Sequence, residues 1–589
     1  MPHAAMSEQP TAPMPAPRAR WKERDAPAGL VEAIARATGV VEPVARVLVG
    51  RGIASVEAAR AFLAPTLREL PDPMRLAGID AALDRVLFAI DKREQIGVFG
   101  DYDVDGVTST VLLVEFLERL GAAVTCTIPD RLVEGYGLSR AGVDRLAAAG
   151  CRLIITVDCG VTAHEEVDYA AQQGIDVVVI DHHTVPVALP RAISVINPHR
   201  IDCTRGSEML CAVGVTFNLA LALRRRLRES GFFSTLRPEP DLKDSLDLVA
   251  LGTVADVVPL VGENRILVSH GVRLMRQGKR PGLRALLDVA HVDLAKVDAA
   301  DLGFQLGPRI NAAGRLGDAI HGVRLLRATS VEDARGLAVR LDQENLARRE
   351  LEKKITEDAI RQVERSDLLR RAKAIVVGDE SWHPGVVGIV AARLVERFAR
   401  PAVVIGEGGR GSGRSVERFH LYEGLQATAS TLAGFGGHAH AAGVRLPPGG
   451  LDAFRTSFLA HAEAVLSEDD LHKVAVHDGD LPVAALSLDL VHKLQQLAPF
   501  GRKNPEPSFV FRSVTPVGVK VLTGGHLKGF VDGRGAGAGA GLIELIAFGA
   551  GERASEFSGI LDILATPERN EWRGTASLQL RVRDFRRAA

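Results

Sequence analysis

Short apolar runs alternate with segments of helical length through the middle of the chain. The runs bounded by polar or glycine residues are Ile96–Phe99, Val124–Pro129, Leu153–Val157, Val177–Ile180 and Ile193–Ile196. Between them lie helical patterns such as Val107–Leu120, where Leu112, Phe116 and Leu120 are four residues apart. Short buried strands separated by helices are typical of a parallel sheet. The pattern therefore predicts an α/β fold with a doubly wound parallel sheet.

The flanking patterns predict further domains. Residues 27–90 read as several helices, and residues 331–371 as one long helix with leucines at helical spacing. That helix suits a spacer between two domains, and its short, imperfect stripe argues against a coiled-coil seam. Five short strands are expected beyond residue 470, at Phe509–Phe511, Val517–Leu522, Leu542–Phe548, Ile560–Ala565 and Leu578–Val582. Five short strands suit an OB-fold β-barrel.

These patterns predict six regions. They are a disordered, proline- and alanine-rich tail over 1–25, a helical region over 26–90, the parallel-sheet domain over 91–330, the connecting helix over 331–371, a second α/β domain over 372–466 and an OB-fold-like domain over 467–589. The tail is expected to be disordered because it has too few large apolar residues to form a core.

Composition narrows the functional classes. The 589 residues carry a net charge of -1, so a nucleic-acid site has to be a local patch and not a global polycation. The five cysteines are unevenly spaced and form no CxxC pair, which indicates neither a disulfide framework nor a zinc site. No apolar run has the length of a membrane span, so we expect a cytoplasmic protein without membrane attachment.

Three aspartates, Asp101, Asp103 and Asp105, follow the first predicted strand and precede a helix. Clustered carboxylates repel one another, and a divalent cation is the usual means of neutralising them. The spacing also matches the start of an EF-hand loop, but the twelfth position is Leu112 in place of glutamate and the preceding segment is strand-like. A metal-free acidic turn is the other alternative.

Two further strands end in residues that can bind a metal. Asp158 follows one strand, and Asp181, His182 and His183 follow another. The carboxyl ends of parallel strands share one edge of the sheet, so the three groups are expected to form one site. Asp256 lies in the apolar stretch Leu248–Leu260 and is read as a helix cap, a buried hydrogen-bonded acid or a fourth metal ligand.

These segments resemble the four motifs of the DHH phosphoesterase superfamily. The motifs are Asp101-Tyr-Asp-Val-Asp-Gly106, Asp158-Cys-Gly160, Asp181-His-His183 and Gly252-Thr-Val-Ala-Asp-Val-Val-Pro259. In detail they resemble the RecJ family of single-strand-specific DNA exonucleases, as does Gly307–Arg315. Trp382–Arg393 and Gly436–Gly443 are similar to the DHHA1 domain that accompanies DHH. The resemblance runs from about residue 25 to the C-terminus.

The resemblance implies a catalytic centre with two divalent metal ions, Mn²⁺ or Mg²⁺. The implied metal ligands are Asp101, Asp103, Asp105, Asp158, His182 and Asp256, and Asp158 is the candidate bridge between the ions. The second histidine, His183, corresponds to the family residue that faces the substrate phosphate. Many relatives carry a histidine where this chain has Phe99, and Asp101 is expected to take over its role. The division of ligands between the ions stays open.

Candidate substrate residues lie in three segments. Arg309, Asn311 and Arg315 are expected in a glycine- and proline-punctuated loop, as phosphate clamps or as members of surface salt bridges. Ser412 and Arg414 belong to a small, flexible, basic segment over 410–415. His438 lies in the glycine-rich segment 434–443, which is read either as a ligand contact or as an ordinary turn.

The C-terminal domain offers four basic residues that could follow a DNA backbone, Arg502, Lys503, Lys520 and Lys528, with few aromatic residues for base stacking. The glycine- and alanine-rich tract 533–541 is expected to be a flexible barrel loop.

The resemblance predicts a metal-dependent 5′→3′ exonuclease on single-stranded DNA that releases 5′-mononucleotides in DNA repair and recombination. Single-stranded DNA is the expected partner, a single-strand DNA-binding protein is a candidate partner, and the protein is expected to be a monomer. A phosphodiesterase for short oligonucleotides or cyclic dinucleotides is one alternative. A non-catalytic single-strand binder is another, although a scaffold has no reason to keep mutually repelling acids.

Overall fold

The computed structural model describes residues 18–131, 133–533, 541–572 and 574–588. The chain divides into two compact units. The large unit comprises Glu23–Asn345 and Val476–Ala589, and the small unit comprises Leu346–Ala475 together with the chain up to Lys22. In the described part of the chain, no helix has both the length and the apolar character needed to cross a membrane.

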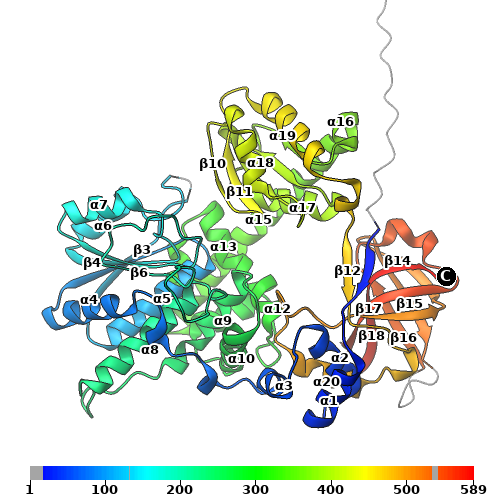
Figure 1. Cartoon of the computed structure of the whole chain (residues 1–589), viewed down its shortest axis with the longest axis horizontal. Coiled ribbons are helices and arrows are strands. Elements are labelled where there is room, and N and C mark those ends of the chain that lie inside the picture. The colour runs from blue at the N-terminus through cyan, green and yellow to red at the C-terminus, as the bar shows by residue number, and fades with distance from the viewer. Residues whose placement is uncertain (1–17, 132, 534–540, 573, 589) are drawn as a thin grey trace, which may run out of the picture. The chain divides into compact units, whose positions relative to one another are not determined.

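A five-stranded parallel sheet in the large unit confirms the predicted doubly wound architecture (Figure 1). The strand order is β3-β2-β4-β5-β6. The strands are β2 (Gln95–Gly100), β3 (Ala123–Thr127), β4 (Cys151–Val157), β5 (Asp176–Ile180) and β6 (Ser194–Ile196). β2, β4 and β5 are almost wholly buried, which explains why their sequences read as continuous apolar runs.

Helices cover both faces of this sheet. Residues of α6 (Arg140–Ala148) and α7 (His164–Gln172) share one core with Phe99, Ile154 and Val179 of the strands. On the other face, Ile96, Val98 and Ile155 pack with α4 (Ile79–Lys92), α5 (Val104–Arg119) and α8 (Ala212–Glu229). Alternate residues of each strand therefore enter different cores, as the two-residue period of a strand requires.

Helix α5 is buried on nearly all sides, because it contacts the sheet, α8, α9 (Leu246–Ala255) and α14 (Ile320–Leu326). The rest of this region is helical, with α10 (Gly262–Met275), α11 (Pro281–Val289), α12 (Ala299–Asp301), a π-helix over Leu302–Leu306 and α13 (Gly307–Leu316). The segment that contains Arg309, Asn311 and Arg315 is thus a helix, and the prediction of a loop was wrong. Gly307 and Pro308 follow directly on the π-helix, with which α13 forms one continuous helical run.

The N-terminal region forms the predicted helices α1 (Ala28–Thr38), α2 (Glu42–Gly50) and α3 (Val56–Leu63). Their buried side chains, including Ile34 and Leu48, share a core with Phe509, Phe511 and Phe585 of the C-terminal barrel. The predicted tail lies partly outside the described residues, over 1–17. Within its remainder, β1 (Arg20–Glu23) pairs with β12 (Val474–His477), so disorder up to residue 25 was wrong.

The C-terminal barrel has six strands in the order β13-β17-β18-β16-β15-β14. They are β13 (Phe509–Val514), β14 (Val517–Leu522), β15 (His526–Asp532), β16 (Leu542–Ala547), β17 (Leu561–Trp572) and β18 (Thr575–Arg587), and the helix α20 (Leu488–Leu494) precedes them. Strand β15 was not predicted; its buried positions 527, 529 and 531 alternate as in a strand, but one of them is a glycine. Most of the expected flexible loop, 534–540, lies outside the described residues.

The small unit begins within α15 (Val331–Arg365), and α16 (Asp367–Arg371) follows. One continuous helix over 331–371 was wrong, because Ser366 leaves the helix and caps α16 through a hydrogen bond from the N–H of Leu369. The unit has a five-stranded sheet in the order β10-β11-β9-β8-β7. The strands are β7 (Ile375–Gly378), β8 (Ala402–Ile405), β9 (Arg410–Arg414), β10 (Gly434–Gly437) and β11 (Ala441–Arg445), with helices α17 (Val387–Phe398), α18 (Leu421–Ala427) and α19 (Leu451–Val465).

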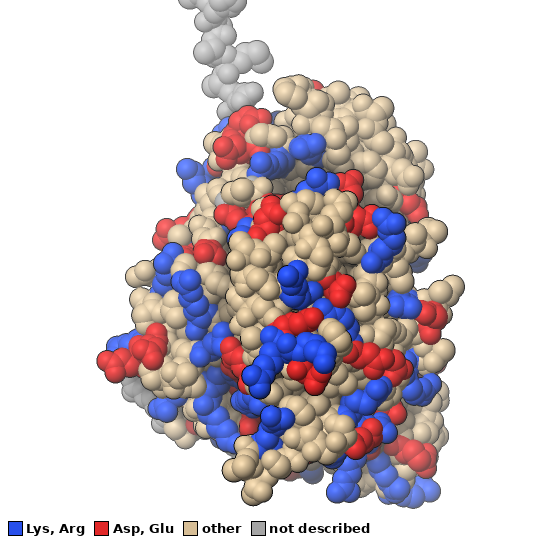
Figure 2. Space-filling view, turned by 90° about the vertical axis from the view of Figure 1, so that its left-hand side faces the viewer, with Lys and Arg blue, Asp and Glu red and all other residues tan. Residues whose placement is uncertain are grey.

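Acidic and basic side chains are intermixed on one face of the protein. Figure 2 shows both signs intermixed over the face that it presents, as the near-zero net charge leads one to expect. This face therefore offers no field of a single sign that would attract DNA over a long range.

Candidate metal centre

The carboxyl ends of β2, β4 and β5 bring the predicted residues together. The N–H of Asp101 donates to the carbonyl of Val157 over 3.3 Å, and the N–H of Asp158 donates to that of Ile180 over 3.0 Å. The three strand ends are thus in register, and Asp101, Asp158 and Asp181 follow as neighbours at one edge. Asp158 has a left-handed backbone, with φ 65°, which aspartate tolerates better than most residues.

The aspartates of the acidic turn make different contacts. Asp103 caps α5, and its Oδ1 accepts hydrogen bonds from the N–H groups of Asp105 and Gly106 over 2.8 and 3.1 Å. Asp105 lies within the first turn of α5 and is buried, so the placement of all three acids before the helix was wrong for this residue. Its carboxylate accepts from the N–H groups of Ala212 and Val213, at the start of α8, over 2.6 and 2.9 Å.

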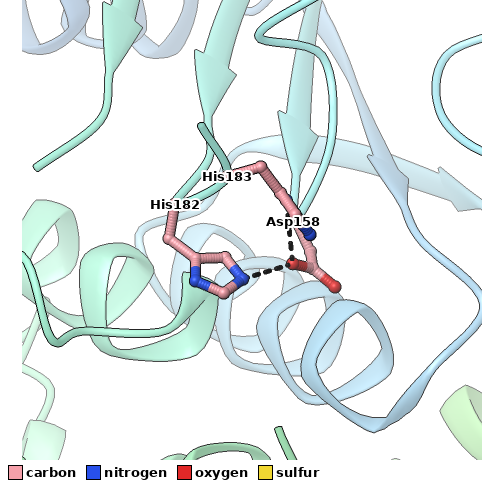
Figure 3. A group of neighbouring side chains, drawn as sticks. All are labelled: Asp158, His182 and His183. Carbon is pink, nitrogen blue, oxygen red and sulfur yellow. Dashed lines mark ion pairs between the residues drawn. The ribbon is translucent and has the colours of Figure 1, made fainter. Parts of the chain in front are cut away.

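His182 joins carboxylates that are far apart in the sequence. Its Nε2 lies 3.2 Å from Asp158 Oδ1, 3.7 Å from Asp256 Oδ2 and 3.8 Å from Asp105 Oδ2. Asp256 is the residue at the C-terminal end of α9, and its carboxylate lies beside His182 with those of Asp105 and Asp158; its role as a metal ligand stays a prediction. Figure 3 shows His182 pointing at the carboxylate of Asp158 from the neighbouring strand end.

The donor atoms fit divalent cations. Three groups of side chains have donor atoms within 4.8 Å of one another, namely Asp101, Asp103 and Asp158; Asp158, His182 and His183; and Asp105, His182 and Asp256. Within the described residues, the buried oxygens Asp101 Oδ1, Asp158 Oδ1 and Asp256 Oδ2 receive no hydrogen bond. Buried carboxylate oxygens without donors are costly unless a cation pairs with them. Oxygen donors with one or two imidazoles suit Mg²⁺ and Mn²⁺.

The protonation of these acids reflects their crowding. Burial, followed by the charge of neighbouring aspartates, raises the pKa values of Asp101, Asp158 and Asp256 well above the ordinary range. Burial and the charge of Asp103 also raise the pKa of Asp105 to about 7, against the opposing hydrogen bonds from Val213 and Ala212. Without a cation, the cluster therefore retains protons near neutral pH.

Asp181 orients His183 and takes no part in the three donor groups. Its carboxylate accepts from the N–H groups of Val161, His182 and His183 over 3.0, 2.7 and 3.0 Å, and lies 2.7 Å from His183 Nδ1. Burial favours a raised pKa for Asp181, but the hydrogen bond and charge of His183 outweigh it and the pKa is lowered. Burial opposes protonation of His183, and its bond to Asp181 nevertheless raises the pKa of the imidazole.

A pocket of about 310 Å³ opens over the cluster. Besides the acids of the turn and Asp256, its lining includes Tyr102, Arg131, Tyr136, Asn311 and Arg315. Tyr136 donates from its hydroxyl to the carbonyl of Asp158 over 3.1 Å, and the same oxygen lies 3.1 Å from His183 Nδ1. The guanidinium of Arg131 lies 4.9 Å from the centre of the Tyr102 ring.

Tyr102, Arg131 and Tyr136 were not among the predicted site residues. A signal was available for the last two, because they lie in the segment 131–138 with positive-φ glycines at 135 and 137. Residue 132 of this segment lies outside the described residues. Nothing in the sequence indicates that the segment folds over Asp158.

The three candidates on α13 have different surroundings. Arg309 is buried and pairs with Asp342 over 2.9 Å, and it donates to the carbonyl of Gln305 over 2.7 Å. Asn311 accepts a hydrogen bond from the N–H of Val104 over 3.1 Å. Asn311 and Arg315 line the pocket, whereas Arg309 does not.

The remaining candidates belong to the small unit. Ser412 and Arg414 lie on β9, and Arg414 donates to the hydroxyl of Ser412 over 3.0 Å. The segment 410–415 is therefore strand and not a flexible loop over most of its length. His438 lies in the turn between β10 and β11, where its N–H donates to the carbonyl of Ala441 over 2.8 Å. These three residues are not part of the cluster in the large unit.

Comparisons with known families agree with this architecture. The profile of the DHH family, N-terminal domain, matches residues 95–253, that of the DHHA1 domain matches residues 371–466, and that of the RecJ OB domain matches residues 477–584.

Relatives match over most of the chain. The single-stranded-DNA-specific exonuclease RecJ of Dickeya dadantii is 42% identical over 542 residues, which cover 88% of this chain and 92% of that protein. The Escherichia coli protein of the same name is 40% identical and covers 86% and 90%. The crystal structure of RecJ in complex with Mn²⁺ from Thermus thermophilus superposes with a TM-score of 0.83 at 30% identity, over 97% of this chain and 80% of that one. With these relatives, this chain belongs to the RecJ family of DHH phosphoesterases.

Proposed function

We propose that this chain is a metal-dependent exonuclease that degrades single-stranded DNA from the 5′ end and releases 5′-mononucleotides. The observation that carries the proposal is the set of buried carboxylate oxygens without hydrogen-bond donors on Asp101, Asp158 and Asp256, of which Asp101 and Asp256 line a pocket together with Arg131 and Arg315. The printed names of the curated RecJ relatives, with coverage of about nine tenths, support single-stranded DNA as the substrate.

The proposed metal ligands are Asp101, Asp103, Asp105, Asp158, His182 and Asp256. Asp158 belongs to two of the three donor groups, which supports it as the bridge between two ions. Solved structures of a relative with Mn²⁺ and with Mg²⁺ support either ion as the cofactor. Such ions lower the pKa of bound water and neutralise the phosphoryl oxygens.

The chain's own residues then orient the substrate. His183, held by Asp181 and protonated more readily than a free imidazole, is placed to donate to a phosphate oxygen. Arg131 and Arg315 line the same pocket and supply positive charge against the phosphates. The exposed half of Tyr136 offers an aromatic surface beside His183, which suits a nucleobase.

The division of labour among domains is also part of the proposal. Residues 91–330 carry out phosphodiester hydrolysis, and residues 372–466 bind the single-stranded DNA through Ser412, Arg414 and His438. The barrel beyond 467 contacts single-stranded DNA through Arg502, Lys503, Lys520 and Lys528. Roles in DNA repair and recombination, a monomeric state, a cytoplasmic location and an interaction with a single-strand DNA-binding protein stay predictions.

The test uses single-stranded DNA labelled at the 5′ or the 3′ end, with Mn²⁺ or EDTA, and the Asp158→Asn variant. Immediate release of a mononucleotide from the 5′ label, with stepwise shortening of the 3′-labelled strand, is expected. The activity should be lost in EDTA and in the variant, and a duplex with blunt ends should be spared.

Two outcomes would redirect the assignment. Hydrolysis restricted to dinucleotides and very short oligomers would favour a small-substrate phosphodiesterase. Binding of DNA without hydrolysis in either metal would favour a non-catalytic scaffold.

A further inference from the structure

Helix α13 supplies part of the cap of helix α5. The first N–H groups of any helix lack partners within the helix. Asp103 Oδ1 accepts from two of them, those of Asp105 and Gly106. The N–H of Val104, the first residue of α5, donates instead to Asn311 Oδ1 over 3.1 Å. The start of α5, within the acidic turn, is thus held by a side chain more than two hundred residues away in the sequence.

This arrangement leaves the Asp103 carboxylate able to bind a metal ion. One of its oxygens serves both helix N–H groups, and Asn311 takes the third. The second oxygen of Asp103 accepts neither of the two bonds from Asp105 and Gly106, and Asp103 belongs to the donor group with Asp101 and Asp158. An aspartate that had to cap all three N–H groups would be less able to bind a cation.

The backbone of α13 also approaches the acidic turn closely at Gly314. A Cβ atom on Gly314 would lie 2.6 Å from the carbonyl oxygen of Tyr102, which real Cβ atoms do not tolerate. Residues three apart on a helix lie on one face. Asn311 and Gly314 therefore form one contact surface against Tyr102 and Val104.

The opposite side of α13 is fixed as well. Arg309 precedes Asn311 by two residues, which is about 200° around a helix. It pairs with Asp342 and with the carbonyl of Gln305, in the π-helix before α13. A π-turn shifts the register of the helix that follows and is frequent at functional sites. The register of α13 directs Asn311 to the acidic turn and Arg309 away from it.

We propose that Asn311 is a positioning residue for the metal centre, which holds the acidic turn of Asp101, Asp103 and Asp105 in its ligand geometry, and not a contact to the substrate. This inference rests on the proposed function of that turn as a metal site. Asn311 acts by accepting the hydrogen bond from the N–H of Val104, and Gly314 allows α13 to lie close to the acidic turn.

The test measures Mn²⁺ affinity of the full-length protein without DNA, by calorimetry, for Asn311→Ala and Asn311→Asp. Loss of the acceptor in Asn311→Ala should weaken Mn²⁺ binding about tenfold, as is typical for partners that orient metal ligands. Asn311→Asp retains an acceptor for the N–H of Val104 and should recover most of the affinity. With saturating Mn²⁺, the KM for single-stranded DNA should stay unchanged in Asn311→Ala.

A substrate contact would give the reverse pattern. Asn311→Ala would keep wild-type Mn²⁺ affinity with a raised KM, and Asn311→Asp would raise the KM further because its charge repels phosphate. That result would overturn the inference. Arg315→Ala is the comparison variant on the same helix, with a raised KM and unchanged Mn²⁺ affinity expected.

Asp103→Asn and Asp158→Asn, measured alongside, distinguish failure of the positioning role of Asn311 from failure of the proposed metal site. If they lose Mn²⁺ binding while Asn311→Ala retains it, only the positioning role of Asn311 fails. If they bind Mn²⁺ like the wild type, the proposed metal site fails, and the inference fails with it. Circular dichroism spectra in EDTA identify any variant that does not fold, and Asn311→Asp then decides between the two roles.

Discussion

The N–H of Leu260 donates to the carbonyl of Arg502 over 2.9 Å and ties the segment after Asp256 to the turn that precedes the C-terminal barrel. The guanidinium of Arg502 also reaches the carbonyl of Val257 over 3.4 Å. Val257 has φ 59°, a left-handed conformation that is unfavourable for a β-branched residue. Such a conformation persists where its surroundings fix it, so contacts from the C-terminal region help to place Asp256.

We expect Gly501→Val to impair the metal centre from outside it. A Cβ atom at this position would lie 2.6 Å from Leu260 Cδ1, so the turn or Leu260 has to move. Turnover at saturating DNA should fall about tenfold, with weaker Mn²⁺ binding, because the displacement reaches Asp256. Gly541→Val is the matched control, since a Cβ atom there meets nothing within 4 Å. Equal turnover in both variants would contradict the coupling.

Asp158→Asn should stabilise the protein in EDTA. Burial and neighbouring charges oppose ionisation of Asp158, and the neutral amide removes that penalty. The melting temperature in EDTA should rise by several degrees, and the increase that Mn²⁺ produces in the wild type should be lost. Asp168→Asn changes a partly exposed acid paired with Arg191, away from the cluster, and should leave the Mn²⁺ effect intact. An unchanged melting temperature in EDTA with a full Mn²⁺ effect would contradict the assignment.

The stability of the metal-free protein should fall as pH rises from about 4 to about 7. The pKa of Asp105 is raised from 3.8 to about 7 in the folded state, so the folded protein binds more protons than the unfolded chain in this range. Urea denaturation in EDTA at several pH values measures the slope, and Asp105→Asn should reduce it.

Because of the same titration, Mn²⁺ affinity should change with pH in the opposite direction to the stability of the metal-free protein. Cations compete with protons for the carboxylates, so Mn²⁺ affinity should increase with pH up to about 7 and binding should release protons. Calorimetry in buffers of different ionisation enthalpy counts these protons. Binding without proton release below pH 7 would show that Asp105 is already ionised in the folded, metal-free state.

Arg309→Ala should lower stability and leave the KM for DNA unchanged. Its guanidinium is buried against Asp342 and the carbonyl of Gln305, outside the pocket. Loss of hydrogen bonds to a charged group should cost about 2 kcal/mol in the free energy of unfolding. A double-mutant cycle with Asp342→Ala should give a coupling of about 1 kcal/mol. An increased KM at unchanged stability would restore the phosphate-clamp interpretation.

Local patterns sufficed for the central sheet and for the principal acids. The apolar runs over 96–99, 153–157 and 177–180 reappear as β2, β4 and β5, because buried parallel strands are apolar on both faces. Aspartates and histidines directly after such strands have to share one edge of the sheet, so the proximity of Asp101, Asp158 and His182 followed from topology alone.

Patterns failed where glycine and proline have more than one use. Gly307 and Pro308 lie in a helical run, although the same residues often punctuate loops. Gly411 and Gly413 lie in β9, which pairs with β8 on one side and with β11 on the other. These pairings hold the segment in an extended conformation that glycine alone does not favour. β15 was missed because Gly529 interrupts its apolar alternation.

The α/β sheet, the edge that carries the acids and the residue types that can bind divalent cations all follow from the order of residues along the chain, because these features depend on period and on the chemistry of single side chains. The partners of those side chains are visible only in the folded protein. Asn311 faces Val104, Arg309 faces Asp342 and Tyr136 reaches Asp158. Such contacts join segments up to 207 residues apart, and they depend on helix register and on packing that no local pattern encodes.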